Sequence, residues 1–115
     1  MNRQTRTMAV MFADISDSTS LYQKLGDAAA RNIVNACLKV INGVLARYEG
    51  RLVKTIGDEV MCVFPDADLA VLAASDMQAQ VSSSKPGNYP VSIHVGLHYG
   101  PVLVEENDVF GDTVN

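Results

Sequence analysis

The sequence contains no cluster of lysine and arginine. Its 9 basic residues are outnumbered by 13 acidic ones, which gives a formal net charge of −4 at pH 7. Because proteins bind nucleic acid largely by neutralising its phosphates, this charge balance argues against nucleic acid as a partner. A polyphosphate ligand would need divalent cations between its oxygens and the acidic side chains.

Long hydrophobic runs are also missing. No apolar stretch approaches the length that spans a bilayer, and the N-terminal MNRQTRT is too polar for a signal peptide. We expect a cytoplasmic domain with no membrane contact of its own, although a longer parent chain could carry an anchor. With 115 residues and 48% hydrophobic content, the chain predicts one domain with a substantial core.

Cysteine is scarce, since the chain holds only Cys37 and Cys62. Both lie in apolar periodic segments without another Cys or a His at metal-ligand spacing, so we expect two reduced and buried thiols. His94 and His98 belong to a region with strand patterning, where hydrogen-bonded structural roles are expected.

Several common catalytic and nucleotide-binding motifs are absent. There is no GxxxxGK[ST] phosphate loop, no GxGxxG, no HExxH and no GxSxG. The stretch that begins at Asp14 also fails as a calcium loop, because Thr19 and Leu25 stand where such a loop requires glycine and a bidentate glutamate. Any nucleotide chemistry has to come from another arrangement of residues.

Hydrophobic patterning predicts an ordered series of strands and helices. The first half is expected to contain a strand at 8–13 that is buried on both faces, followed by helices at 19–25 and 28–48. A hairpin at 51–64 that turns at Gly57-Asp58 comes next, and then a helix opened by Pro65-Asp66. The last expected elements are two strands within 91–106, bent or paired around Gly100-Pro101. The order βααββαβ, with a further strand after it, favours an α+β fold: a ferredoxin-like sandwich with helices on one face of a mainly antiparallel sheet. Because residues 113–115 begin an element without finishing it, we interpret residues 1–115 as one domain whose C-terminal part is missing.

Two aspartates, Asp14 and Asp58, lie at strand-to-turn junctions. If their strands are neighbours in the sheet, both carboxylates emerge at one end and could hold hard cations, with the Ile15 carbonyl as a further oxygen ligand. The segment after Asp14, which includes Ser18 and Thr19, leads into a helix N-terminus that suits an anionic phosphate. The alternative is that Asp14 caps the short helix and that Asp58 is an ordinary turn residue.

Three segments resemble, in order and spacing, the signature blocks of the class III nucleotidyl cyclase catalytic domain. They are FADISDSTSL at 12–21, GRLVKTIGDEVMCVF at 50–64 and VGLHYGPVLVEENDVFGDTVN at 95–115. The resemblance implies that Asp14, Asp58 and the Ile15 carbonyl bind two Mg²⁺ or Mn²⁺ ions, that Lys54 and Asp108 recognise adenine, and that Asn115 orients the ribose and helps to stabilise the transition state.

The activity implied by this resemblance is that of an adenylyl cyclase in cyclic nucleotide signalling, which converts ATP to 3′,5′-cyclic AMP and pyrophosphate. Such domains act as head-to-tail dimers, in which one subunit supplies the metal aspartates and the other the base-reading residues, so a homodimer is expected. The family's transition-state arginine follows Asn115 by one helical turn, so the 115 residues alone are expected to be inactive. The alternatives are a guanylyl cyclase and a non-catalytic module for nucleotide binding or dimerisation.

The base-reading pair favours ATP over GTP. Adenine offers an acceptor at N1 and a donor at its amino group, which match Lys54 as donor and Asp108 as acceptor, whereas guanine offers the opposite pattern at N1–H and O6.

One departure from the family is Asp17-Ser18, where Gly-Phe is frequent, and it adds a negative charge near the expected phosphates. The role of Asp17 is left open, with helix capping as one alternative.

Overall fold

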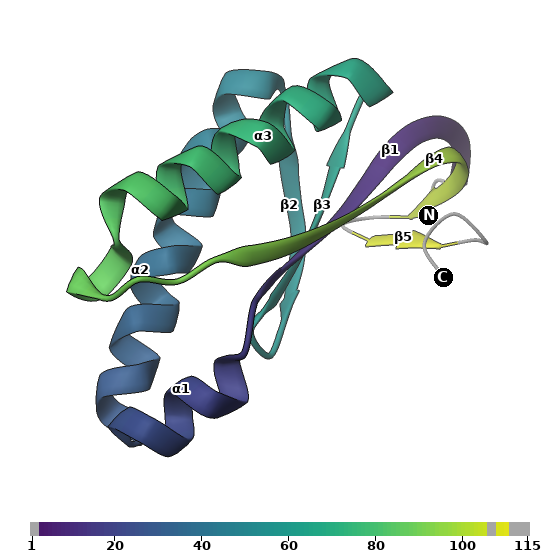
Figure 1. Cartoon of the computed structure of the whole chain (residues 1–115). Helices are drawn as coiled ribbons and strands as arrows, with labels where there is room; N and C mark the ends of the chain where they lie inside the picture. The colour runs from purple at the N-terminus through teal and green to yellow at the C-terminus, as the bar shows by residue number, and fades with distance from the viewer. Residues whose placement is uncertain (1–2, 106–107, 111–115) are drawn as a thin grey trace.

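The computed structural model describes the backbone of residues 3–105 and 108–110 and the side chains of residues 4–104 (Figure 1). Its elements are β1 (Arg3–Ile15), α1 (Ser18–Leu25), α2 (Asp27–Leu45), β2 (Arg51–Ile56), β3 (Glu59–Phe64), α3 (Ala67–Ser84), β4 (Ile93–Glu105) and β5 (Asp108–Phe110). Short 3₁₀ turns at Ala46–Tyr48 and Pro86–Asn88 follow α2 and α3. The predicted order βααββαβ is confirmed.

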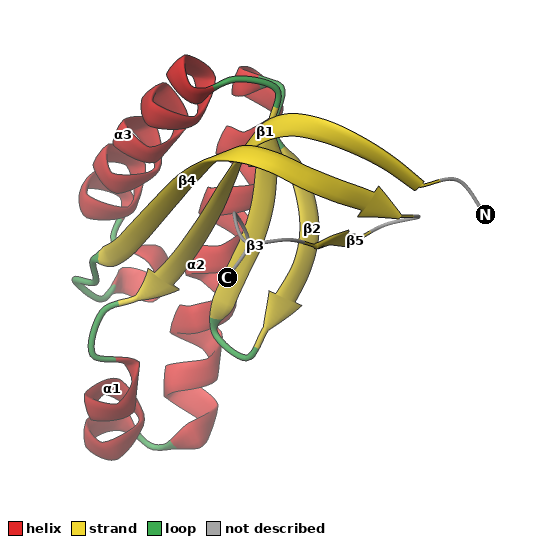
Figure 2. Cartoon of the chain, turned by 90° about the vertical axis from the view of Figure 1, so that its right-hand side faces the viewer, coloured by secondary structure: helices red, strands yellow, loops and turns green. Residues whose placement is uncertain are grey.

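The strands form one sheet in the order β2-β3-β1-β4-β5, and every neighbouring pair is antiparallel. Figure 2 shows all three α-helices on the same side of this curved sheet. The opposite face, here called the open face, carries no helix of the described residues. The ferredoxin-like α+β fold is therefore confirmed. No described helix is both long and apolar enough to cross a membrane.

β4 is a single strand of 13 residues, so the expectation of two strands within 91–106 is wrong. It pairs with β1 along its whole length, from Ile93 opposite Ile15 to Glu105 opposite Arg3. Glycine and proline at 100–101 are poor strand formers, which is why the sequence suggested a break. Pairing with the equally long β1 overrides that local preference, and the two strands curve together instead (Figure 1 and Figure 2).

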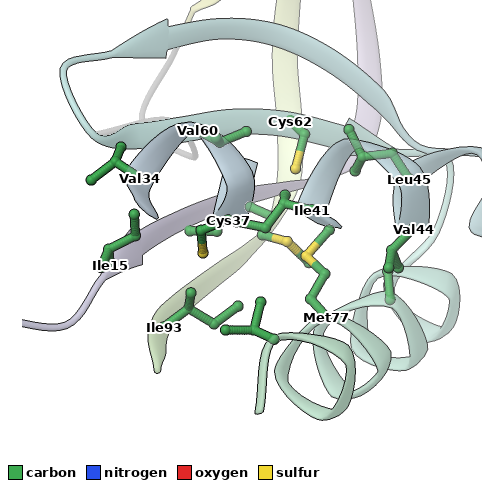
Figure 3. Close-up of a cluster of buried hydrophobic side chains, with 14 of the residues drawn as sticks. Ile15, Val34, Cys37, Ile41, Val44, Leu45, Val60, Cys62, Met77 and Ile93 are labelled. Carbon is green, nitrogen blue, oxygen red and sulfur yellow. The ribbon is translucent and has the colours of Figure 1, made fainter. Parts of the chain in front are cut away.

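β1 is a central strand and is buried on both faces, as predicted. Met11 faces the helices and Val10 faces the open side, and both side chains are fully buried. On the helix side, one core joins the sheet to α2 and α3 (Figure 3). The residues that α2 contributes are Ala30, Ile33, Val34, Cys37, Ile41, Val44 and Leu45, which recur at the spacing of one helical face.

The two thiols belong to this core. Cys37 on α2 and Cys62 on β3 are both free and buried, as the sequence predicted, and Figure 3 shows them in the same apolar cluster. Burial disfavours the thiolate, and it raises the pKa of Cys37 to about 11 and that of Cys62 to about 12. The nucleophilic form of either residue is therefore scarce in the folded protein.

We expect both cysteines to resist alkylation until the domain unfolds. Near pH 8, about one Cys37 side chain in a thousand would carry the thiolate, and the core blocks access to it. Iodoacetamide treatment followed by peptide mass spectrometry should find Cys37 and Cys62 unmodified in the native protein and modified in denaturing guanidinium chloride. Modification of the native protein at the unfolded rate would contradict the buried placement.

A polar cluster links the turn after α2 to α3. Asp76 of α3 accepts hydrogen bonds from the Tyr48 hydroxyl at 3.0 Å, from Arg47 Nη1 at 3.2 Å and from Gln80 Nε2 at 3.4 Å. The hydrogen bond from Tyr48 is the main cause that lowers the pKa of Asp76, with smaller contributions from Gln80 and Arg47. The same hydrogen bond raises the pKa of Tyr48.

Replacing Asp76 by asparagine should lower the melting temperature near neutral pH. Because its pKa is lower in the folded than in the unfolded chain, Asp76 stabilises the fold above its ordinary pKa of 3.8, and this contribution is lost as pH falls through the folded-state pKa. The difference between Asp76→Asn and wild type should therefore shrink on acidification. The control is Glu49→Gln, which removes an exposed carboxylate near the same turn. A difference that is constant with pH would contradict this role for the Asp76 charge.

Candidate active site

The alternation of side chains along β1 places Asp14 on the open face. Ala9, Met11 and Ala13 pack in the core beneath the helices, and Val10 packs on the other side. Successive strand residues point to opposite faces, so Asp14 shares the face of Val10. Its side chain is exposed there.

The pairing of β1 with β3 brings the two predicted metal aspartates to one end of the sheet. Asp14 lies directly opposite Glu59, and Asp58 is the residue before Glu59, in the turn that joins β2 to β3. Gly57 has φ of +61°, a conformation that glycine adopts without steric cost, and this allows the tight turn. Asp14 and Asp58 therefore end two neighbouring strands, as the sequence analysis required.

Ile15, whose carbonyl is the third predicted oxygen ligand, is the last residue of β1. Its side chain is buried in the helix-side core, with 2% exposed, which anchors the strand end next to Asp14. The following residue, Ser16, donates its backbone N–H to the Ser92 carbonyl at 2.9 Å, so the end of β1 is also tied to the start of β4. The Ile15 carbonyl is thus carried by a fixed stretch of backbone.

The donor set suits a hard cation. Carboxylate and carbonyl oxygens are the ligands that Mg²⁺ uses, commonly one or two carboxylates with the remaining positions filled by water and phosphate. Among the described residues there is no group of three or more His, Cys, Asp or Glu side chains placed to hold a metal. Two carboxylates and one carbonyl, from Asp14, Asp58 and Ile15, are a donor set of the open kind, which leaves positions for water and phosphate.

The start of α1 excludes one of the alternatives. The helix begins at Ser18, and its N-cap residue is Asp17, which has φ of +55° and makes no side-chain capping hydrogen bond. Asp14 therefore does not cap this helix, and neither does the Asp17 carboxylate. Ser18 is half-buried and Thr19 is exposed in the first turn, where backbone N–H groups lack helical partners.

Lys54 reaches the open face because β2 contains a bulge. Leu52 pairs with Cys62, yet Lys54 pairs with Met61, so Val53 is an extra residue in the ladder. Cys62 belongs to the helix-side core and Met61 to the open-face cluster, which places Lys54 on the same face as Asp14. Lys54 is exposed.

The remaining predicted residues lie near or beyond the end of the described chain. Asp108 is the first residue of β5, which pairs with β4, and β5 also approaches β2, the strand that carries Lys54. The side chain of Asp108 and the whole of Asn115 are outside the described residues. The structure thus brings together the two strands that carry the predicted base-reading pair.

Two residues next to Asp14 were not among the predicted site residues. Across the sheet, Asp14 lies between Glu59 on β3 and His94 on β4. The expectation that His94 and His98 are hydrogen-bonded structural residues is wrong, because both are exposed on the open face and neither ring has a hydrogen bond within the described part of the chain. The only sequence signal for Glu59 was its position after Asp58.

Comparison with known proteins shows which family has this sequence and fold. The family model for the adenylate and guanylate cyclase catalytic domain matches residues 1–115. The chain belongs to this family, which confirms the resemblance found in its sequence.

Individual relatives support the assignment. An adenylate cyclase from Streptomyces coelicolor is 32% identical over 114 residues, which are 96% of this chain and 28% of that protein. An uncharacterized protein from Mycobacterium tuberculosis is 36% identical over 111 residues, 95% of this chain and 28% of that protein. The chain thus spans less than a third of the length of these curated relatives.

Solved structures share the fold. The catalytic core of a rhodopsin-guanylyl cyclase with converted specificity, in complex with ATPαS, has a TM-score of 0.87 and 26% identity, and the match covers 98% of this chain and 70% of that one. A bacterial light-regulated adenylyl cyclase has a TM-score of 0.88 at 23% identity, over 100% of this chain and 39% of that one. Such similarity extends over the whole chain.

Proposed function

We propose that this chain is the catalytic domain of an adenylyl cyclase that makes 3′,5′-cyclic AMP and pyrophosphate from ATP for cyclic nucleotide signalling. The observation that carries the proposal is the register of β1 and β3, which places Asp14 beside the turn that holds Asp58. Family membership and the adenylate cyclase relatives support the same activity.

Asp14, Asp58 and the Ile15 carbonyl would hold two Mg²⁺ or Mn²⁺ ions. When bound, these cations would lower the pKa of the ribose 3′-hydroxyl and neutralise charge on the triphosphate. The residues next to Asp14 support this assignment. Its register neighbours are Glu59 and His94, and neither is a lysine or arginine that could bind phosphate without a metal ion.

The reaction is an intramolecular displacement at phosphorus. The 3′-oxygen forms a bond to the α-phosphorus, the bond from that phosphorus to the oxygen bridging the β-phosphate breaks, and pyrophosphate leaves with the electron pair. The hydroxyl proton passes to solvent. Ser18, Thr19 and the N–H groups of the first turn of α1 bind phosphate oxygens and hold the chain of phosphates in line for the attack.

Lys54 and Asp108 would select adenine. The ammonium donates to N1 and the carboxylate accepts from the amino group, so a guanine base would meet a donor with a donor and an acceptor with an acceptor. The approach of β5 to β2 supports a joint role for these residues, and so does the bulge that turns Lys54 to the open face.

The site would be completed by a second copy of the chain in a head-to-tail homodimer. One subunit provides Asp14 and Asp58, and the other provides Lys54, Asp108 and Asn115, the last to orient the ribose. Exposure of both Asp14 and Lys54 on the open face supports this arrangement, because exposed side chains on that face are accessible to another subunit.

Asp14→Asn and Asp58→Asn should each reduce cyclic AMP formation by more than about 100-fold in the full-length protein. Mutation of a residue that only hydrogen-bonds to a metal ligand already lowers metal affinity or activity by about 10- to 100-fold. The assay measures cyclic AMP from ATP with Mn²⁺, and chelation should abolish it. Asp27→Asn, which removes an exposed carboxylate at the start of α2, is the matched control. A wild-type protein that binds ATP tightly and forms no cyclic product would instead be a non-catalytic module.

Exchanging the base-reading pair should change the substrate. In the full-length protein, Lys54→Glu combined with Asp108→Cys should lower the ratio of kcat/KM for ATP to that for GTP by at least about 100-fold, because mismatched polar groups are left unpaired. Lys39→Glu makes the same charge change on an exposed residue of α2 and should leave the ratio unchanged. An unaltered ATP preference in the double variant would refute these roles.

A further inference from the structure

A cleft lies on the other side of the β1–α1 turn from Asp14 and Asp58. It is a cleft of about 550 Å³ bounded by α1, the C-terminal end of α3 and the connection from α3 to β4. Asp14, Ile15 and Asp58 are not among its lining residues. Its volume falls in the range of about 300 to 1,000 Å³ that is typical of sites for small molecules.

Two lysines give the cleft an excess of positive charge. Lys24 lies in the last turn of α1 and Lys85 is the C-cap of α3, and both line the cleft. Neither ammonium forms a hydrogen bond or ion pair within the part of the chain that the structure describes. Asp17 is the one acidic residue of the lining, so two cations face one anion. This excess is notable in a chain of net charge −4.

The rest of the lining combines apolar surface with hydroxyl groups. Leu21 and Val91 line the cleft beside the ring of Tyr89, and they belong to or pack against the helix-side core. Ser16 also lines the cleft, and its hydroxyl is a buried polar group without a hydrogen-bond partner within the described residues. Buried hydroxyls are normally paired, so this one marks a place where a polar group is missing.

The floor of the cleft continues directly into the candidate active site. Ser16 and Asp17 follow Asp14 and Ile15 and lead into α1. The hydrogen bond from Ser16 N–H to the Ser92 carbonyl, at 2.9 Å, already joins this turn to the segment on the other side of the cleft. A molecule held between α1 and that segment would therefore favour one position of the β1–α1 turn.

We propose that this cleft binds a small organic anion, with a carboxylate or phosphate group held by Lys24 and Lys85 and an apolar body against Leu21 and Val91, and that binding regulates the cyclase. The binding itself is independent of the proposed function. The regulatory part rests on the adenylyl cyclase activity proposed above, because it acts through the backbone that carries Asp14 and Ile15.

Binding can be tested with benzoate and phenyl phosphate as probes, and with neutral benzyl alcohol as the uncharged comparison. Titrations of the full-length protein, followed by ligand-observed NMR, should show both anions binding more tightly than the alcohol. The Lys24→Gln, Lys85→Gln double variant should bind the anions at least about tenfold more weakly, since hydrogen bonds to charged groups are lost. Lys39→Gln, on the exposed face of α2 outside the cleft, should bind as wild type does.

Three results would overturn the site. The first is that neither anion binds at concentrations up to about 10 mM, which is beyond the weak end of ordinary affinities. The second is that the double variant binds the anions as tightly as wild type does. The third is that wild type binds the neutral alcohol as tightly as the anions. The tighter of the two anions identifies whether the natural head group is a carboxylate or a phosphate.

A cyclic AMP assay separates this proposal from the proposed function. We expect the tighter anion to change turnover by at least about twofold in wild type and to have no effect in the double variant, because a ligand shifts the turn only through its differential affinity. Anion binding with unchanged turnover would refute the regulation. Anion binding in a protein that makes no cyclic nucleotide would refute the cyclase and leave the binding site standing.

Discussion

The arrangement depends on the antiparallel pairing of β1 with both of its neighbours. β1 is buried on both faces, so its register with β3 and β4 is fixed by apolar side chains such as Val10 and Met11. A slip of one residue would move Met11 to the open face and Asp14 to the helix side. Core packing therefore holds the carboxylate where it can meet a cation, and stability and site geometry have the same physical origin.

The bulge in β2 is a second constraint on the site. Without the extra residue at Val53, strict alternation would place Lys54 on the helix face, opposite to the face that carries Asp14. One extra residue in the ladder is a small local disruption, and it keeps Lys54 on the same face of the sheet as Asp14. The bulge thus places Val53 and Lys54 on the open face one after the other, and Val53 packs there against the cluster that includes Met61.

Local patterns in the sequence predicted most of the elements, because they depend on residues close to one another. The buried strand of β1, the amphipathic face of α2 and the Gly57 turn are of this kind. The unbroken course of β4 and the bulge at Val53 depend on pairing with a distant strand, which no local pattern records. The cleft was missed for the same reason, since Lys24 and Lys85 are far apart in the sequence and line one cleft only because α1 and α3 both pack against α2.

The two sides of the β1–α1 turn differ in charge, which suits them to different ligands. Asp14 lies opposite Glu59 across the sheet, so under the proposed function a triphosphate would approach these carboxylates together with cations that balance their charge. The cleft has the opposite character, because Lys24 and Lys85 outnumber Asp17 there and could hold a singly charged group directly. A polyphosphate with its metal ions would therefore bind near Asp14, and a simple anion would bind in the cleft. The short backbone segment of Ser16 and Asp17 would connect them.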